Sequence, residues 1–195
     1  TWKRSDHITS TAPPCGASPI TDLEARVKIP IRKKGDLVLS TPAAPVTTFD
    51  ADLERLVADM FETMYDVHGV GLAAPQIGVS LRLFVMDCAH GDEPPRRVVM
   101  ANPEILATSG TQSGTEGCLS VPGVSSELSR PAFVRARGQD AKGEWFEIEV
   151  DGLDARCVMH ETDHLDGKLY LDRLTPLKRD IVRRKIRKLQ RNGDW

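Results

Sequence analysis

The stretch His160-Glu161-Thr162-Asp163-His164 decides the fold and the chemistry that we expect of this chain. Two histidines four residues apart lie on one face of a helix, one turn above the other, so both imidazoles can bind the same metal ion. Glu161 projects about 100° around the helix from His160, which places its carboxylate beside that ion. The pattern therefore predicts a metal-binding helix whose glutamate acts as a general base on a water molecule.

The flanking residues predict where this helix begins and ends. Asp151 is placed as the N-cap, with Asp154 at the third helical position, and Gly167 is placed to end the helix in a left-handed conformation. Between these ends, one stripe at spacings of four, three and four contains Leu153, Cys157, His160 and His164. We expect this stripe to face the core, away from a charged side that carries Glu161, Asp163 and Asp166.

A catalytic site of this type needs a third protein ligand and one open position. Cys157 shares the stripe, but it lies about 10 Å along the helix axis from His164, too far for bonds of roughly 2.0–2.3 Å. The other cysteines are Cys15 in a Pro-rich N-terminal segment, Cys88 at the end of a strand-like run, and Cys118. The sequence favours Cys118, because Gly117 lets the backbone approach a site closely.

Three segments of the chain resemble the signature motifs of a known family, the peptide deformylases. In order, they are GVGLAAPQ at 69–76, EGCLS at 116–120 and HETDHL at 160–165. The sequence resembles the catalytic domain of that family from about Val27 to about Leu174, and Met159 is a departure, because the family often has Gln there. A chance match of three motifs in order is far rarer than a match of one.

The resemblance implies roles for ten residues. The metal ligands would be Cys118, His160 and His164, and Glu161 would be the general base. The backbone N–H of Leu119 and the side-chain amide of Gln76 would stabilise the oxyanion. The methionine side chain of the substrate would lie against Val70, Leu153 and Cys157, and Gly71 would contact the peptide backbone. Plain core packing is the other interpretation of Val70 and Leu153.

The resemblance also implies a reaction and a cofactor. The chain would be a metal-dependent hydrolase that removes the N-formyl group from the initiator N-formylmethionine of nascent polypeptides and releases formate. One divalent ion is expected. The family typically uses Fe²⁺, and one thiolate with two imidazoles also suits Zn²⁺, Ni²⁺ or Co²⁺.

Composition limits the other function classes. The chain has 195 residues, a net charge of −2, 40% hydrophobic and 28% charged residues, so there is no overall attraction to nucleic acid or to a membrane. No apolar run approaches the roughly 20 residues that a membrane-spanning helix needs. A metal-binding thiolate needs reducing surroundings, so we expect a cytoplasmic protein, with an organelle as the alternative.

We expect three segments: an N-terminal extension (1–26) rich in Ser, Thr and Pro, the catalytic domain (27–174), and a C-terminal basic helix and tail (175–195). In the last segment apolar residues recur at helical spacing, and Lys or Arg fills most other positions. A basic helix can bind phosphates by releasing counterions. The resembling bacterial enzymes dock such a helix on ribosomal RNA, so we expect the ribosome as a partner. A solvated helix packed on the domain is the alternative.

Periodicity predicts the remaining elements. A helix is expected from Asp50 to Val67, with Leu53, Val57, Met60, Phe61 and Met64 on its buried face. Strands are expected at Leu81–Met86, Val98–Ala101, Phe133–Arg137 and Trp145–Val150, the last two joined by a hairpin. The predicted fold is α+β, with short antiparallel strands around a central metal-binding helix and a C-terminal basic amphipathic helix.

Two rival functions are considered. The first is a metallopeptidase of the HExxH class, which usually takes His or Glu as third ligand, and the sequence shows no distal candidate for that role. The second is a ribosome- or RNA-binding protein with a vestigial metal site, against which the intact Glu161 and Gln76 argue.

Overall fold

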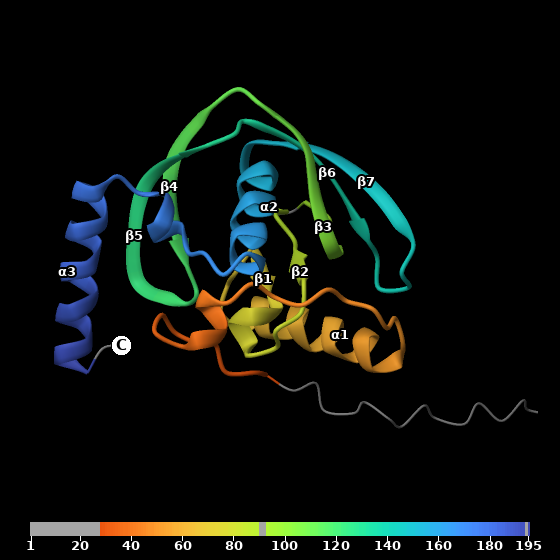
Figure 1. Ribbon diagram of the computed structural model, residues 1–195, viewed down its shortest axis with the longest axis horizontal. Helices are drawn as coiled ribbons and strands as arrows, with labels where there is room; N and C mark the ends of the chain where they lie inside the picture. Colours follow the sequence, from red (N-terminus) through yellow and green to blue (C-terminus); the bar gives the residue numbers. More distant parts are fainter. Residues whose placement is uncertain (1–27, 90–92, 194) are drawn as a thin grey trace, which may run out of the picture.

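The chain is described here in a computed structural model over residues 28–89, 93–193 and 195. Figure 1 shows helix α2 (Gly152–Leu165) at the centre of the molecule, enclosed by strands, with α1 (Ala51–Asp66) beneath it and α3 (Pro176–Asn192) on the outside. One antiparallel sheet has the order β1-β2-β3-β6-β7, and β4 and β5 form a second, two-stranded antiparallel sheet. This arrangement confirms the predicted α+β fold.

The strands are β1 (Gly71–Ala73), β2 (Leu83–Met86), β3 (Val98–Ser109), β4 (Gln112–Cys118), β5 (Val121–Arg130), β6 (Phe133–Gln139) and β7 (Trp145–Asp151). Three short 3₁₀ helices lie at Leu37–Ser40 (η1), Ala74–Ile77 (η2) and Tyr170–Arg173 (η3). The predicted strand at Val98–Ala101 is only the first part of β3, which continues to Ser109 as the partner of β6. Strands β1, β4 and β5 were not predicted.

Helix α1 forms within one residue of each predicted end. Its N-cap Asp50 accepts hydrogen bonds from the backbone N–H groups of Asp52 and Leu53, which satisfies two donors of the first turn. The five residues predicted for its apolar face are all buried, and Met60 and Met64 are fully so. They pack against β1 and β2, so α1 fixes the segment that leads into β1.

The predicted ends of α2 are correct, but two details of it are wrong. Asp151 occupies the N-cap position without making a side-chain capping hydrogen bond, whereas Gly167 has the predicted left-handed backbone, with φ of 69°. Glu161 and Asp163 are buried and not on a charged outer side. The reason is that strands of both sheets enclose α2, so it has little outer side to expose (Figure 1).

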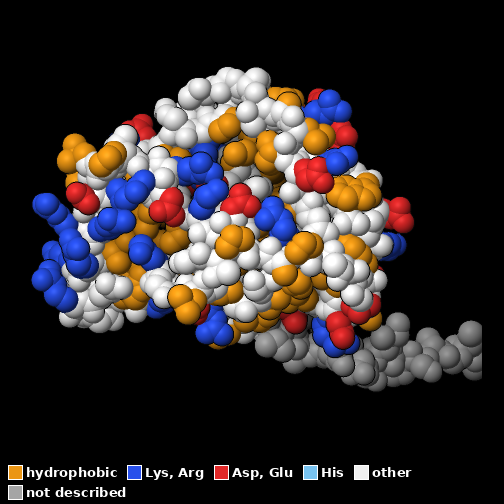
Figure 2. All heavy atoms as spheres, in the orientation of Figure 1, with side chains coloured by type: hydrophobic (Ala, Val, Ile, Leu, Met, Phe, Trp, Pro, Cys, Tyr) orange, Lys and Arg blue, Asp and Glu red, His pale blue; other side chains and the backbone are white. Residues whose placement is uncertain are grey.

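Helix α3 packs on β5 through the buried Val182 and Ile186. Figure 2 shows Lys and Arg side chains gathered over this helix, at the left edge of the view. The predicted apolar stripe is only partly covered, since the exposed fractions of Leu177 and Ile181 are 72% and 48%. No helix among the described residues is both long and apolar enough to span a bilayer. The predicted extension 1–26 lies outside the described residues.

Candidate active site

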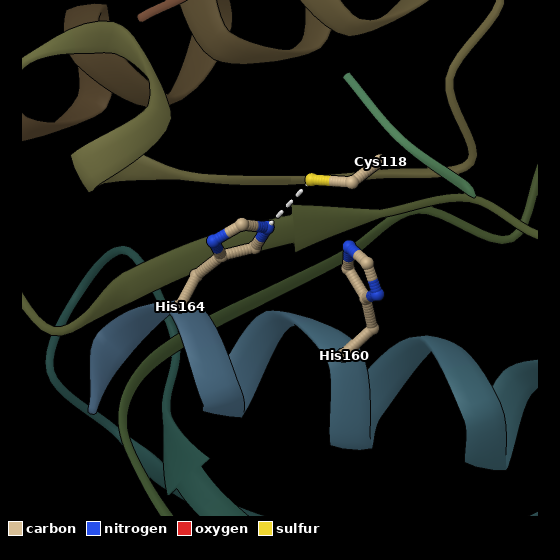
Figure 3. A group of neighbouring side chains, drawn as sticks. All are labelled: Cys118, His160 and His164. Atoms are coloured by element: carbon tan, nitrogen blue, oxygen red, sulfur yellow. Dashed lines mark hydrogen bonds between the residues drawn. The ribbon is translucent and has the colours of Figure 1, made fainter. Parts of the chain in front are cut away.

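Helix α2 and the end of β4 bring three potential metal ligands together. Figure 3 shows His160 and His164 rising from α2 toward Cys118. The ligand atoms of the three residues lie within 4.8 Å of one another, and the Cys118 Sγ is 3.2 Å from the His164 Nε2. Burial and the neighbouring His160 hold the pKa of His164 well below its ordinary value, so its imidazole is neutral and has a free lone pair. One thiolate and two imidazoles are a donor set that fits a divalent transition metal.

The other cysteines lie elsewhere. The Sγ atoms of Cys157 and Cys88 both face the backbone oxygen of Val70, at 3.6 Å and 3.9 Å. A hydrogen bond with Cys88, together with burial, raises the pKa of the Cys157 thiol well above its ordinary value. Both are therefore buried thiols outside the group of three, and Cys15 lies outside the described residues.

Glu116 orients the first histidine. The Nδ1 of His160 lies 2.6 Å from the Glu116 Oε1, so Nδ1–H donates to the carboxylate and Nε2 is left for a metal. Burial opposes the charge of Glu116, but hydrogen bonds from His160 and Arg130 outweigh it and lower its pKa to about 2. Burial likewise lowers the pKa of His160, yet its hydrogen bonds with Cys118 and Glu116 raise it well above its ordinary value in the metal-free site. Cys118 and Glu116 therefore favour a positive charge on His160, whereas His164 stays neutral.

A buried ion network holds Glu116 in place. Arg130 donates to Glu116 through Nε at 3.1 Å and Nη2 at 2.6 Å, and to Asp163 through Nη1 at 2.7 Å. Arg156 adds a hydrogen bond of 3.0 Å to Glu116, and Arg173 pairs with Asp163. This network is not evident from the sequence, because its members come from β4, β5, α2 and η3 and only the fold brings them together.

Glu161 lies beside the three potential ligands. It is 3% exposed, and its Oε2 has no hydrogen-bond partner among the described residues. Burial, only partly opposed by His160, raises its pKa to about 7 in the metal-free site. Its other oxygen lies against β1, where a Cβ added at Gly71 would be 2.4 Å from Oε1 of Glu161 and 2.6 Å from the Sγ of Cys157. Glycine at 71 therefore allows the edge strand to pack against this carboxylate.

The amide of Gln76 has a fixed orientation. Its Oε1 accepts a hydrogen bond of 2.9 Å from the backbone N–H of Ala73, so the NH₂ group points the other way. That group lies 3.6 Å from the Sγ of Cys118 and 3.3 Å from the Oγ of Ser120. Gln76 thus presents a preorganised donor next to the three potential ligands.

A cleft of about 810 Å³ joins these groups. Nine of the ten residues predicted for the site line it, namely Val70, Gly71, Gln76, Cys118, Leu119, Leu153, Cys157, His160 and Glu161. The tenth, His164, is buried beside them. The exposed fractions of Val70 and Leu153 are 36% and 37%, so plain core packing is the wrong interpretation of these two residues.

The sequence model of the polypeptide deformylase family matches residues 28–180. The chain belongs to this family. A peptide deformylase of Acidobacterium capsulatum is 49% identical to it over 166 residues, which are 85% of this chain and 98% of that protein. A solved peptide deformylase structure from Legionella pneumophila has a TM-score of 0.77 and 48% identity, with 84% of this chain and 95% of that one covered. A peptide deformylase 1B of Arabidopsis thaliana has a TM-score of 0.78 at 36% identity, over 84% of this chain and 91% of that one.

These matches confirm the resemblance and the hydrolase class. Peptide deformylases are metal-dependent hydrolases that remove the N-formyl group from nascent formylmethionyl peptides. Membership of this family, together with the three potential ligands grouped at the cleft and beside it, makes the chain an enzyme of that class.

Proposed function

We propose that the chain hydrolyses the formyl amide of N-formylmethionyl peptides with the ten residues acting in the roles named above. The observation that carries the proposal is the unpartnered carboxylate oxygen of Glu161, buried in the cleft beside Cys118, His160 and His164. A divalent cation held by those three ligands supplies Lewis-acid chemistry, which makes a water molecule more acidic and polarises a carbonyl group.

Glu161 moves the proton. Its carboxylate takes a proton from the attacking water and gives it to the leaving amine of the methionine residue, which then departs as the free N-terminus. Burial raises the pKa of Glu161 to about 7 in the metal-free site, and a cation held beside it would lower that pKa and favour the carboxylate that accepts the proton.

Gln76 and Leu119 stabilise the charge that develops on the formyl oxygen. The hydrogen bond from Ala73 to Gln76 Oε1 directs the amide NH₂ toward the Cys118 side of the cleft, so this donor needs no reorientation during the reaction. The backbone N–H of Leu119, the residue after the cysteine, is the second donor. A formyl carbon bears only hydrogen, and a tight site between these two donors rejects an acetyl group on size.

The wall formed by Val70, Leu153 and Cys157 binds the unbranched methionine side chain, because all three present apolar surface to the cleft. Strand β1 is an edge strand of its sheet, which allows Gly71 to pair with the peptide backbone as an added strand.

The native metal is proposed to be Fe²⁺, with Zn²⁺, Ni²⁺ or Co²⁺ as replacements that fit the same donors. Purification without oxygen, followed by metal analysis and an activity assay on the same sample, tests this. Full activity that follows zinc content and not iron content would overturn the assignment.

The proposed partner of α3 is the ribosome, in the cytoplasm. Eight basic residues lie on this helix. Lys178 and Arg179 hydrogen-bond to backbone oxygens within the protein, whereas Arg184, Arg187 and Arg191 border one surface hollow. Changing these three to Gln should weaken co-sedimentation with ribosomes and reduce its salt dependence, since each lost phosphate contact removes about 0.9 from the slope. The control changes Arg135, Arg137 and Lys142 to Gln, on β6 and the turn after it. These changes should leave co-sedimentation and its salt dependence unchanged.

An assay of formate release tests the proposed deformylation. The protein should release formate from formyl-Met-Ala-Ser without oxygen, and no acetate from acetyl-Met-Ala-Ser. Cleavage of an internal bond would instead support a metallopeptidase, and metal binding without turnover would support an RNA-binding protein with a vestigial site.

A further inference from the structure

The cleft extends well past the wall that receives the methionine side chain. Its α2 side carries Leu153 and Cys157, and its other side is formed by the start of β5, with Pro122, Gly123 and Val124. Trp195 lines the same cleft. A volume of about 810 Å³ is near the upper end of the roughly 300–1,000 Å³ found for sites that hold drug-sized ligands. The cleft therefore has room for more of a peptide than its formylmethionyl end.

The end of α3 directs Trp195 to this cleft. The helix stops at Asn192, and Gly193 has a left-handed backbone with φ of 79°, a conformation that turns the chain away from the helix axis. After this turn, Trp195 packs against the apolar cluster of β5 and α3 that includes Val121 and Val124. Leu189 packs on the same cluster, and its Cδ1 would lie 3.5 Å from a Cβ added at Gly123. The last turn of α3 is thus tied to the β5 wall of the cleft.

Trp195 is only half-buried, although it packs on an apolar cluster. An indole in this position has one face on the protein and leaves apolar surface and an N–H donor for a ligand. The residues of β5 in the cluster on which it packs, Val121 and Val124, are uncharged and apolar and also line the cleft. This part of the cleft therefore suits an uncharged, apolar or aromatic side chain.

We propose that Trp195 is a specificity-determining residue, which contacts the side chains of the substrate that follow formylmethionine. The inference rests on the proposed deformylation at the same cleft. Trp195 gives the enzyme a preference among formylated peptides by their length and by the apolar character of their second to fourth residues. The formyl group and the methionine side chain bind on the α2 side of the cleft.

The test is a kinetic comparison of full-length variants on matched peptides. The variants are Trp195→Ala, Trp195→Phe and the control Trp145→Ala. Trp145 is 54% exposed on β7, stacks with Arg137 and does not line the cleft, so the control removes a tryptophan outside the cleft. The peptides are formyl-Met-Ala, formyl-Met-Ala-Ser-Ser and formyl-Met-Ala-Leu-Phe.

Trp195→Ala should raise KM for formyl-Met-Ala-Leu-Phe by about five- to tenfold, the size expected for loss of an aromatic anchor, with kcat unchanged. Formyl-Met-Ala should react as with the wild type, and Trp195→Phe should keep most of the affinity because it keeps an aromatic face. The Trp145→Ala enzyme should behave as the wild type on all three peptides.

Two results would overturn the inference alone: a wild type that deformylates all three peptides with the same KM, or a Trp195→Ala enzyme whose losses are equal on all three. Failure of the wild type to release formate from any peptide would overturn the proposed function, and this inference with it.

Discussion

The Nδ1–H of His160 donates a hydrogen bond of 2.6 Å to the Oε1 of Glu116, and this bond sets which nitrogen faces the site. The same carboxylate accepts from Arg130 and from Arg156, so its lone pairs are fully used and its position is fixed. Partners of this kind orient a ligating histidine and tune its basicity.

Glu116→Gln should lower metal affinity by about 10–100-fold, because it keeps the shape of the side chain but removes the charge that faces His160. Competition with a chelator at several concentrations measures the change. Glu104→Gln is the control, since Glu104 pairs with Arg137 at the surface, away from the three potential ligands. Equal metal affinity in the Glu116 and Glu104 variants would show that Glu116 does not contribute to metal binding.

Glu161→Gln should lower kcat by about 10²–10⁴-fold while the metal stays bound, since in the proposed mechanism the carboxylate acts on water and not on the ion. Formate release and metal content are measured on the same preparation. A metal-loaded variant with near-normal activity would exclude Glu161 as the general base.

Cys118→Ala should lose tight metal binding, whereas Cys88→Ala and Cys157→Ala should keep it. Cys118 is grouped with the two histidines, and the other two thiols face the backbone of Val70. Cys157→Ala should also raise KM modestly, because it removes part of the wall that we propose for the methionine side chain. Metal analysis after dialysis tests the set, and full occupancy in Cys118→Ala would refute the ligand assignment.

The sequence could single out the three potential ligands, which the structure places close together, because each belongs to a local pattern: two histidines at helical spacing, and a cysteine after glycine. The burial and the ion pairs of Asp163 could not be predicted in this way. On an isolated helix, an aspartate one residue before the second histidine lies on the polar side. In the fold it is 2% exposed and paired with Arg130 and Arg173, since the strands around α2 leave little polar side to solvent.

Strands β4 and β5 escaped prediction for a related reason. The segment Gln112–Cys118 is made of Gln, Ser, Gly, Thr, Glu and Cys, without the alternation of apolar residues that marks a half-buried strand. It becomes a strand because each of its residues pairs with β5, from Gln112 opposite Arg130 to Gly117 opposite Ser125. That pairing also places Glu116 and Arg130 in the buried network, which no local pattern could indicate.

Gly71→Ala should lower kcat/KM while leaving the metal bound. The added Cβ would lie 2.4 Å from Oε1 of Glu161, closer than such atoms approach, so the carboxylate or strand β1 must move. A shift of even about 1 Å in a catalytic group can cost on the order of 10²-fold. Kinetics and metal analysis on one sample test this, and an unchanged kcat/KM would mean that β1 does not hold Glu161 in its working position.

Acid should destabilise the metal-free protein through Glu116. Its pKa in the folded state is about 2, below the roughly 4.3 of a free glutamate. A carboxyl whose pKa is lowered by folding contributes stability that is fully present above the unfolded pKa and is lost as the pH falls through the folded pKa. The contribution is on the order of 3 kcal/mol above pH 5, and it should disappear progressively between about pH 4.5 and pH 2.

Urea unfolding of the wild type and of Glu116→Gln, both with chelator present, measures this contribution at pH 7, 5 and 3.5. The wild type should lose about 1 kcal/mol, roughly a third of its advantage over Glu116→Gln, at pH 3.5, because there the unfolded glutamate begins to bind a proton that the folded one excludes. The comparison with Glu116→Gln is needed because other carboxylates also titrate in this range and change both proteins equally. A difference in unfolding free energy that is the same at all three pH values would show that hydrogen bonds from Arg130 and His160 do not lower the pKa of this carboxyl.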